Sequence, residues 1–336
     1  MADKDDTTNY DGMTVEEHDV VVLRRGTEGL STAAYGREIQ ERLPDYSVRV
    51  AATPQEERAA IESARIATGI TIDEALLERA DRLELFVVAS SGYGHLPMDA
   101  LAANDVRVVN ASGIHAPGIA EQVFGYILAF ARRLPEGWRR QERSEWRHYQ
   151  AEELAGSTVT VVGLGSVGHH VLERTAGFGV DTIGIRYTPE KGGPADEIVG
   201  FDDECVHDAL ARTDFLVLSS PLTETTKNFL DEAALATLPP TARVINVARG
   251  GLVDTDALTH ALQIGDIAGA AIDTTDPEPL PPEHPLWNMG NVQITPHMAG
   301  HTPEHWPRLA RILADSAKLL DAGRELHSMT NLVETP

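Results

Sequence analysis

The stretch TVTVVGLGSVG, from Thr158 to Gly168, decides the fold expected for this chain. Its first five residues have the composition of a buried strand, and the residues that follow it, His169 to Phe178, have helical spacing. Three glycines between these segments give the pattern G-x-G-x-x-G. The first allows a tight turn, the second lets the backbone approach a pyrophosphate, and the third lets the helix pack on the strand; they are Gly163, Gly165 and Gly168. The stretch therefore predicts a dinucleotide site that faces the helix N-terminus.

A second strand is expected about twenty residues further on, in DTIGI, and the residue after it distinguishes the cofactors. An acidic residue there would accept hydrogen bonds from the ribose hydroxyls and repel a 2′-phosphate. This position holds Arg186, followed by Tyr187 and Thr188. A cation and hydrogen-bond donors suit a phosphate, so the sequence favours NADP(H), with NAD(H) as the second cofactor. The alternative is an exposed arginine that has no influence on the choice of cofactor.

Strand-like and helical segments alternate on both sides of this stretch, which is typical of parallel sheets covered by helices. Before it, strands are predicted at Val20–Leu23, Tyr46–Val50, Ala67–Thr71 and Leu85–Ala89, and helices at Thr32–Leu43, Pro54–Ala64 and Ile72–Ala80. Gly118–Leu134 predicts a buried helix, and the polar stretch Arg139–Tyr149 is expected to cross between domains. After it, strands are predicted in DTIGIR, DFLVLSS, ARVINVA, GAAID and NVQITPH, with a final helix over about Glu304–Ala322.

Composition limits the class of protein. The chain has 336 residues, 42% of them hydrophobic, which is enough for two domains. Its net charge of −24 comes from 52 acidic and 28 basic residues, and only four of the basic residues are lysines. Such a surface repels nucleic acid and anionic lipid, so we expect neither as a partner. Excess carboxylate with scarce lysine resembles proteins of salt-loving cells, which gives a hypothesis about environment.

The sequence contains no run near the ~20 apolar residues that a membrane span needs. Met1 to Asp19 is acidic and lacks the basic and apolar regions of a signal peptide, so a soluble cytoplasmic protein is expected. Residues 1 to about 17 are expected to be disordered or loosely attached. The single cysteine, Cys205, cannot form an internal disulfide, and no metal site is predicted.

Three polar side chains follow predicted strands in the second half of the chain. Reduction of a keto acid requires a cation for the carboxylate, a proton donor for the carbonyl oxygen, and a group that keeps the donor protonated. Arg249, Glu278 and His297 supply these types just past the carboxyl ends of parallel strands, where open α/β sheets bind ligands. A carboxylate beside His297 favours the imidazolium form. Asp276 is the alternative carboxylate.

These segments, in this order, resemble the D-2-hydroxyacid dehydrogenase family. The resemblance runs from about Leu85 to Thr302 and rests on VVGLGSVG, SSPLTETTKNFL, INVARGGLVDTDALTHAL, GAAIDTTDPEPLP and ITPHMAG. It implies that Arg249 binds the substrate carboxylate and that His297 is the acid in reduction and the base in oxidation. Glu278, which stands before a Pro-Leu pair as the family's glutamate does, accepts a hydrogen bond from the imidazole.

The resemblance also implies further contacts. Asp273 corresponds to the aspartate that meets the nicotinamide carboxamide, and Gly92 and Tyr93 lie in a loop that approaches the substrate carboxylate. Gly94 stands where relatives commonly carry aspartate. The remaining cofactor contacts implied are Ser166, Val167, Ser220, Pro221, Thr226, Val247, Ala299 and His297 itself.

The fold implied is α/β with two doubly wound parallel-sheet domains. A Rossmann cofactor domain, about 113–300, is inserted in a discontinuous flavodoxin-like substrate domain, 1–112 and 301–336, because the last helix should return to it. A homodimer is expected, to which the helix at 118–134 contributes. The expected activity is an NADPH-preferring 2-keto acid reductase. The alternatives are a glyoxylate or hydroxypyruvate reductase and a dinucleotide-sensing protein like the related corepressors; formate dehydrogenases carry glutamine where Glu278 stands.

Overall fold

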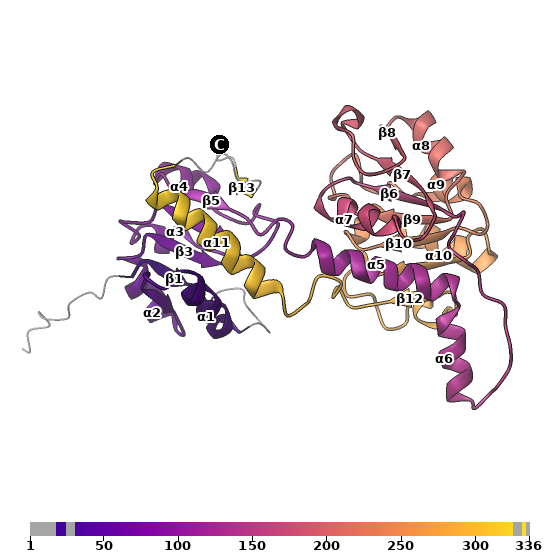
Figure 1. The fold of residues 1–336 in the computed structure, drawn as a ribbon, viewed down its shortest axis with the longest axis horizontal. Helices are drawn as coiled ribbons and strands as arrows, with labels where there is room; N and C mark the ends of the chain where they lie inside the picture. Colours follow the sequence, from indigo (N-terminus) through magenta and orange to yellow (C-terminus); the bar gives the residue numbers. More distant parts are fainter. Residues whose placement is uncertain (1–17, 25–30, 325–330, 334–336) are drawn as a thin grey trace, which may run out of the picture. The chain divides into compact units, whose positions relative to one another are not determined.

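The computed structural model describes residues 18–24, 31–324 and 331–333. The expected disorder of residues 1–17 lies outside the described residues. Contacts divide the chain into two compact units (Figure 1). Unit 1 comprises Met1–Ile114 and Pro303–Pro336, and unit 2 comprises His115–Thr302. These limits lie two residues from the boundaries expected at both crossings, 112/113 and 300/301.

Unit 1 is built on a sheet in the order β13-β5-β4-β3-β1-β2, in which only β13 is antiparallel to its neighbour. The first five strands alternate with helices, the doubly wound arrangement of flavodoxin-like folds. The strands are β1 (Val20–Val22), β2 (Val48–Val50), β3 (Ile66–Gly69), β4 (Leu85–Val88), β5 (Arg107–Val109) and β13 (Leu332–Val333). The helices are α1 (Thr32–Arg42), α2 (Pro54–Ile61), α3 (Glu74–Leu77), α4 (Met98–Ala103) and α11 (His305–Asp321).

The returning helix α11 closes the core of unit 1. It packs along α1, where the rings of Tyr35 and Trp306 stack with their centroids 4.6 Å apart. Both rings are buried, and burying a large apolar side chain stabilises a fold by about 1.5–3 kcal/mol. At the far end, Asp321 of α11 accepts hydrogen bonds from Tyr46 and Arg65. The C-terminal helix is therefore an integral part of this unit.

Unit 2 contains a seven-stranded parallel sheet in the order β12-β11-β10-β9-β6-β7-β8. Counted from β6, its first strands follow the order 3-2-1-4-5-6 of the Rossmann fold. The strands are β6 (Thr158–Val162), β7 (Asp181–Ile185), β8 (Glu197–Val199), β9 (Phe215–Leu218), β10 (Arg243–Asn246), β11 (Gly269–Ile272) and β12 (Val292–Ile294). The helices are α5 (Ala116–Ala131), α6 (Leu134–Glu142), α7 (Ser166–Thr175), α8 (Asp203–Leu210), α9 (Glu232–Thr237) and α10 (Thr255–Ile264), with 3₁₀ turns η1 (Pro189–Lys191), η2 (Gly250–Leu252) and η3 (Pro285–Asn288).

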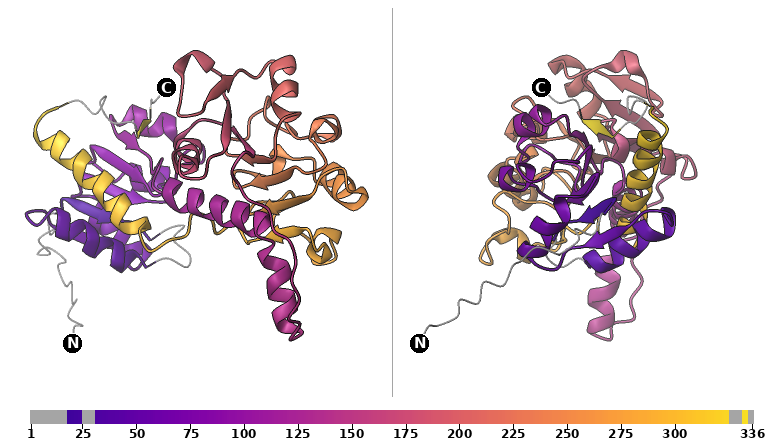
Figure 2. Two further views of the ribbon diagram at one scale, coloured as in Figure 1. Left: turned by 45° about the vertical axis from the view of Figure 1, so that its right-hand side comes forward. Right: turned by 90° about the vertical axis from the view of Figure 1, so that its left-hand side faces the viewer.

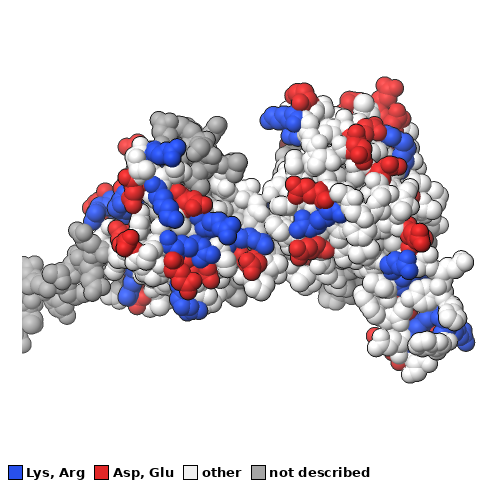
Figure 3. All heavy atoms as spheres, viewed as in Figure 1, with Lys and Arg blue, Asp and Glu red and all other residues white. Residues whose placement is uncertain are grey.

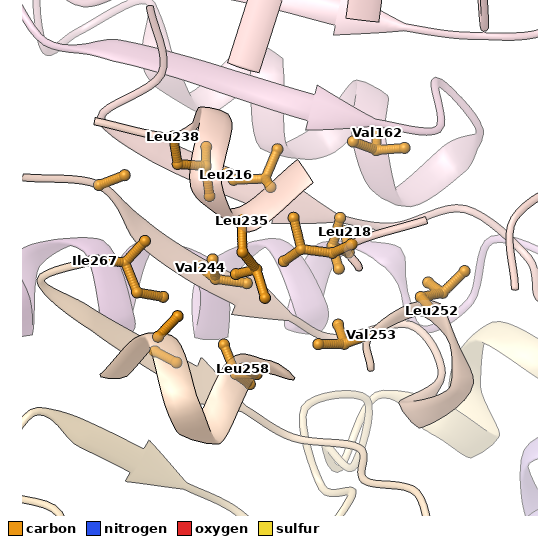
Figure 4. Packing of buried hydrophobic residues seen from close by; sticks show 14 of the residues in the cluster. Val162, Leu216, Leu218, Leu235, Leu238, Val244, Leu252, Val253, Leu258 and Ile267 are labelled. Atoms are coloured by element: carbon orange, nitrogen blue, oxygen red, sulfur yellow. The ribbon is translucent and has the colours of Figure 1, made fainter. Parts of the chain in front are cut away.

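Both faces of this sheet are buried, as the near-continuous apolar strands predict. Figure 4 shows one face, where Leu216, Leu218 and Val244 of the central strands meet leucines of the covering helices, such as Leu235 and Leu258. The other face packs under α5 and α7. The central strands are thereby fixed, and their carboxyl ends form a rigid edge.

Two predictions from the sequence are corrected. The stretch Arg139–Tyr149 does not cross between domains: it lies inside unit 2, partly in α6, which projects away from the sheet in Figures 1 and 2. The helix predicted at Ile72–Ala80 is limited to α3, because the Asp73 side chain caps it by accepting from the Leu76 amide. The short strands β5, β8 and β13 were not predicted. None of the described helices is both long and apolar enough to cross a bilayer.

Candidate active site

The glycine loop after β6 requires glycine at two of its three positions for steric reasons. Gly163 has φ +95°, and a Cβ there would lie 2.7 Å from the Ser220 backbone at the end of β9. A Cβ on Gly168 would lie 2.1 Å from the Gly163 carbonyl oxygen. A Cβ on Gly165 would meet no described atom within 4 Å. The loop lies between β6 and β9, where the strand order reverses and where doubly wound sheets bind ligands.

Helix α7 begins directly after this loop without a side-chain cap. Its N-cap is Gly165, which has no side chain to accept from the amides of the first turn, where Ser166 and Val167 lie. The other helices that follow strands of this sheet begin differently: α8, α9 and α10 are each capped by an aspartate carboxylate, from Asp202, Asp231 and Asp254. The α7 amides and the positive end of the helix dipole therefore remain available to an anion.

Arg186 stands next to this loop, as the sequence predicts. The Gly163 amide donates to the carbonyl of Ile185, 2.8 Å away, and this bond brings the end of β7 to the first glycine. One guanidinium nitrogen of Arg186, Nη1, donates to Gly192 O at 2.5 Å, while the buried Nε has no partner among the described residues. Arg186 thus holds the turn at η1, and its guanidinium keeps N–H groups that can donate a hydrogen bond to a phosphate.

The aromatic side chain after Arg186 is largely exposed. Tyr187 is 60% exposed, and its ring stacks on Phe201, with centroids 5.0 Å apart. Thr188 is half-buried at the start of η1. The end of β7 therefore presents an aromatic surface beside the guanidinium.

The other predicted cofactor contacts fall into two groups. Ser220 Oγ is buried and has no hydrogen-bond partner among the described residues, and Pro221 beside it is exposed. By contrast, the Thr226 hydroxyl donates to Pro221 O at 2.7 Å, so it stabilises its own turn. Val247 and Ala299 are buried in the core cluster that α5 and α7 cover. An uncapped helix, a glycine loop and two buried donors without partners fit a dinucleotide.

Arg249 follows β10 and is exposed at its carboxyl end. The buried Asn246 holds this turn from both sides, because its Nδ2 donates to Arg249 O at 2.9 Å and its Oδ1 accepts from the Ala248 amide at 3.1 Å. The next residue, Gly250, packs so closely on the Thr275 carbonyl that a Cβ would lie 2.1 Å away. The Arg249 turn is therefore fastened to the segment that follows β11.

Glu278 and His297 are in contact. His297 Nδ1 lies 2.7 Å from Glu278 Oε1, and both side chains are about half exposed in unit 2. A carboxylate only accepts hydrogen bonds, so Nδ1 carries the proton and Nε2 is the nitrogen left for a ligand. The Asp276 alternative has no such contact; the carbonyl of Asp276 accepts from Thr255. Arg249, Glu278 and His297 thus follow β10, β11 and β12, three neighbouring strands.

Asp273 organises the loop that carries His297. It is 3% exposed; its Oδ1 accepts from the Met298 amide at 2.9 Å and its Oδ2 from the Ala299 amide at 3.0 Å. The His297 amide donates to the Asp273 carbonyl at 2.8 Å. These bonds hold His297 at φ +50°, which costs a residue other than glycine about 1–3 kcal/mol. With the Thr295 hydroxyl, the Asp273 carboxylate accepts from three donors, so about one of its four acceptor positions is left for another.

Gly92 and Tyr93 belong to unit 1, in the loop after β4. No atom of the described residues lies within 4 Å of a Cβ built on Gly92, and Tyr93 is 40% exposed. The loop backbone is held by side chains: Ser90 Oγ donates to Gly92 O at 2.6 Å, and Asn110 Nδ2 to Ser91 O at 3.1 Å. Both predicted residues therefore lie at the carboxyl edge of the unit 1 sheet.

Three residues that support the site are not among those predicted from the sequence. Asn246, the last residue of β10, could have been noticed as a polar side chain at the end of a buried strand. Thr295 and Tyr126 hydrogen-bond to one another and, through Thr295, to Asp273. Tyr126 gave no signal, because one aromatic residue in an apolar helix is ordinary core. Within the described part of the chain, no cluster of His, Cys, Asp or Glu is arranged to hold a metal ion.

The fold and this edge define a doubly wound α/β protein with a dinucleotide-type glycine loop and an Arg–Glu–His group on neighbouring strands. Residues 124–299 match the family model described as "D-isomer specific 2-hydroxyacid dehydrogenase, NAD binding domain". The chain belongs to the D-isomer specific 2-hydroxyacid dehydrogenase family.

Relatives agree with this assignment. D-3-phosphoglycerate dehydrogenase of Methanocaldococcus jannaschii is 30% identical over 304 residues, which cover 89% of this chain and 57% of the relative. This chain thus spans less than three fifths of that relative's length. Glyoxylate reductase of Thermofilum pendens is 34% identical over 253 residues, 72% of this chain and 73% of the relative.

Solved structures show the same fold. A D-isomer specific 2-hydroxyacid dehydrogenase from Xanthobacter autotrophicus Py2, in complex with NADPH, superposes with a TM-score of 0.76 at 28% identity, covering 95% of this chain and 98% of that one. A family protein from Aeromonas salmonicida has a TM-score of 0.79 at 25% identity, covering 95% and 100%. The expected fold class is thereby confirmed.

Proposed function

We propose that this chain transfers hydride between a nicotinamide dinucleotide and a small 2-keto or D-2-hydroxy acid, and that it prefers NADPH as a 2-keto acid reductase. One observation carries the proposal: the His297–Glu278 pair, at 2.7 Å, stands beside the Arg249 turn at the edge of the sheet that bears the glycine loop. The names and the NADPH complex of the relatives support it.

In this proposal each side chain has one task. The Arg249 guanidinium binds the substrate carboxylate in a bidentate pair and draws electron density from the adjacent carbonyl. His297 donates its Nε2 proton to the carbonyl oxygen, and Glu278, on Nδ1, stabilises the imidazolium before transfer. The bound nicotinamide supplies the hydride that the carbonyl carbon accepts. In oxidation, neutral His297 takes the hydroxyl proton at the same nitrogen.

The cofactor would lie on the unit 2 loop. The first-turn amides of α7, at Ser166 and Val167, would bind the pyrophosphate. The Arg186 guanidinium, of which only Nη1 is bound to Gly192 O, would pair with a 2′-phosphate, and Ser220 would donate its hydroxyl to the dinucleotide. Asp273 has one acceptor position left for the carboxamide. A solved relative in complex with NADPH supports the binding of this nucleotide, and another was solved with NAD.

We assign the parts of the chain accordingly. Unit 2 would be the cofactor domain and unit 1 the substrate domain, in which Gly92 and Tyr93 are the candidate substrate-binding residues. The carboxyl-edge loop after β4 is held in a defined conformation by Ser90 and Asn110, which supports a binding role.

The test is the initial rate of NADPH and, separately, NADH oxidation with glyoxylate, hydroxypyruvate and linear or branched 2-keto acids. NAD⁺ reduction with D-3-phosphoglycerate completes the set. Rapid NADPH oxidation with one of the larger keto acids is expected. Preference for glyoxylate or hydroxypyruvate would establish the second candidate, which the Thermofilum relative favours. Tight NADPH binding without turnover of any acid would instead establish a dinucleotide sensor.

A homodimer is part of the proposal. The α5 side chains are largely buried within unit 2, whereas α6 and the loop after it expose Trp138 at 56% and Trp146 at 95%. That loop returns over α6, where the Arg140 guanidinium lies 5.0 Å from the Tyr149 ring centre. Exposed tryptophans on a projecting arm suit burial by a second copy. Light scattering should give twice the mass of the chain, and less for Trp146→Ala; a monomeric wild type would refute the dimer.

We also propose that folding depends on concentrated salt. The net charge is −24, and although Figure 3 shows basic side chains among the acidic ones on the face in view, carboxylates outnumber cations across the chain. Salt near 1 M shortens the screening length to about 3 Å and weakens repulsion between carboxylates. Unfolding temperatures should therefore rise along a potassium chloride series, and equal stability in dilute buffer would refute the idea.

A further inference from the structure

Tyr126 of α5 is connected to the loop of His297 through two hydroxyl groups. Its ring is 3% exposed, and its hydroxyl bonds to Thr295 Oγ1, which in turn bonds to Asp273 Oδ1. The direction of these bonds follows from Asp273, whose carboxylate can only accept. Thr295 therefore gives its one hydroxyl proton to Asp273, and Tyr126 must donate to Thr295. Burial raises the pKa of Tyr126, so this donor stays protonated in the ordinary pH range.

Asp273 transmits the position of these hydroxyls to the loop. The oxygen that accepts from Thr295 also accepts from the Met298 amide, and the second oxygen accepts from the Ala299 amide. A carboxylate held by Thr295 on one side has its rotamer fixed, so the two amides are fixed as well. They lie directly after His297, whose φ of +50° persists only where its surroundings hold it.

Helix α5 touches the same loop at two further points. His115 Nδ1 donates to Gly300 O at 3.0 Å, and Gly118 approaches Thr302 so closely that a Cβ would lie 2.8 Å from its methyl group. The Tyr126–Thr295 bond is thus the third attachment of the helix to this loop, and Thr295 is the attached residue nearest in sequence to His297. Since α5 packs on α7 and the sheet, it provides a rigid support.

We propose that Tyr126 is a positioning residue for His297, acting through Thr295 and Asp273. The inference rests on the proposed function, because it assigns His297 as the proton donor. Removing the Tyr126 hydroxyl leaves Thr295 without its donor and frees its side chain to rotate. The Asp273 carboxylate then loses its fixed orientation, and His297 samples positions away from Glu278 and from the substrate.

The chain contains a matched control in unit 1. Tyr35 is 1% exposed, its hydroxyl lies 3.0 Å from Thr68 Oγ1, and that hydroxyl donates to Val87 O at 2.8 Å. Tyr35→Phe therefore removes the same kind of buried Tyr-to-Thr hydrogen bond, with the same direction, far from His297 in sequence and in another unit. Any effect of Tyr126→Phe that Tyr35→Phe lacks is specific to the loop.

The first measurement is hydrogen–deuterium exchange over the peptide that contains Met298 and Ala299, which needs no turnover. Tyr126→Phe and Thr295→Val should speed exchange there by roughly fivefold, the effect of one lost hydrogen bond, while Thr295→Ser and Tyr35→Phe should match the wild type. Unchanged exchange in Tyr126→Phe would overturn the proposal, whatever the enzyme does.

The second measurement is the kinetics of keto acid reduction. Tyr126→Phe should lower kcat roughly fivefold to tenfold with little change in KM for the keto acid, since the Arg249 turn that would bind its carboxylate is held by Asn246 and not by Asp273. The double variant Tyr126→Phe/Thr295→Val should be no slower than Thr295→Val alone, because both act through one chain of bonds. Unchanged kcat in Tyr126→Phe, or equal loss in Tyr35→Phe, would overturn the proposal. If the wild type reduces no keto acid, the proposed function fails, and the exchange data still decide whether Tyr126 holds the loop.

Discussion

The two units connect their first strand to the helix that follows it in opposite ways. In unit 2, three residues separate β6 from α7, Gly163 adopts φ +95°, and the helix begins without a side-chain cap. In unit 1, nine residues separate β1 from α1, and Ser31 caps the helix by accepting from the Ala34 amide. The sheets follow the same doubly wound plan. The connection, and not the sheet, therefore decides whether a helix N-terminus is open to a ligand.

The carboxyl edges of the two sheets carry different groups. At both edges a polar side chain holds the loop backbone: Asp273 accepts from the Met298 and Ala299 amides in unit 2, and Asn110 donates to Ser91 O in unit 1. The unit 2 loops carry the Glu278–His297 pair, whereas the unit 1 loop carries Gly92, which has no side chain. Substitutions in unit 2 should accordingly change chemistry and cofactor choice, and those in unit 1 should change substrate binding.

The largest effect is expected from His297→Ala. Loss of the proton donor should lower kcat about a thousandfold, within the range that general acid catalysis contributes. NADPH affinity should stay close to that of the wild type, because the glycine loop is untouched. Stopped-flow rates and fluorescence titration measure the two quantities. Near-normal turnover would remove His297 from the mechanism and weaken the contrast between the edges.

The next effect is expected from Arg186→Asp, which places a carboxylate against the 2′-phosphate. KM for NADPH should rise about a hundredfold, and KM for NADH should change much less. Arg186→Gln, which can still donate to Gly192 O, controls for loss of the turn contact. Steady-state kinetics with both nucleotides check this. Equal loss with NADPH and NADH would mean that Arg186 does not select the cofactor.

A smaller effect is expected in unit 1. Asn110→Ala removes the donor to Ser91 O and lets the loop of Gly92 and Tyr93 relax. KM for the keto acid should rise about threefold to tenfold, with kcat within about twofold, because the Asn110 bonds to Ser91 O and from the Ser112 amide are both lost while the proton donor is unaffected. Should kcat fall more than KM rises, the division between a binding edge and a chemical edge would be wrong.

The smallest effect concerns Asp321, where α11 is tied to Tyr46 and Arg65. Hydrogen bonds from Tyr46 and Arg65 lower the pKa of Asp321, so its contribution is present above the pKa of the unfolded chain, near 4, and is lost as pH falls through the lower folded value. The carboxylate is about half exposed, so Asp321→Asn should cost only a few tenths of a kcal/mol at pH 7. Urea unfolding at pH 7 and pH 3 should show a smaller difference in acid; Asp315→Asn, an exposed site on the same helix, is the control.

The sequence predicts the strands of unit 2 well because their apolar runs and glycine punctuation are local properties. It places Arg249, Glu278 and His297 at strand ends, and the structure brings the last two into contact. It does not predict β8, whose side chains are half-buried at the sheet edge, or β13, which pairs with a strand more than two hundred residues away. The sequence also does not predict the Tyr126–Thr295–Asp273 chain of hydrogen bonds. Tyr126 lies 169 residues before Thr295 and 147 residues before Asp273, and only tertiary packing brings them together.

The hydrogen bond between His115 and Gly300 places the two ends of unit 2 side by side. Because the chain enters and leaves this unit at neighbouring points, the unit is suited to insertion into a surface loop of another protein. It is also suited to circular permutation, with new termini opened elsewhere. Neither insertion nor permutation would need a long linker, because His115 at the start of the unit and Gly300 near its end already lie within hydrogen-bonding distance. During evolution, the same closeness would allow a gene segment that encodes a nucleotide-binding unit to be inserted into a second fold. The sheets of both folds would stay uninterrupted.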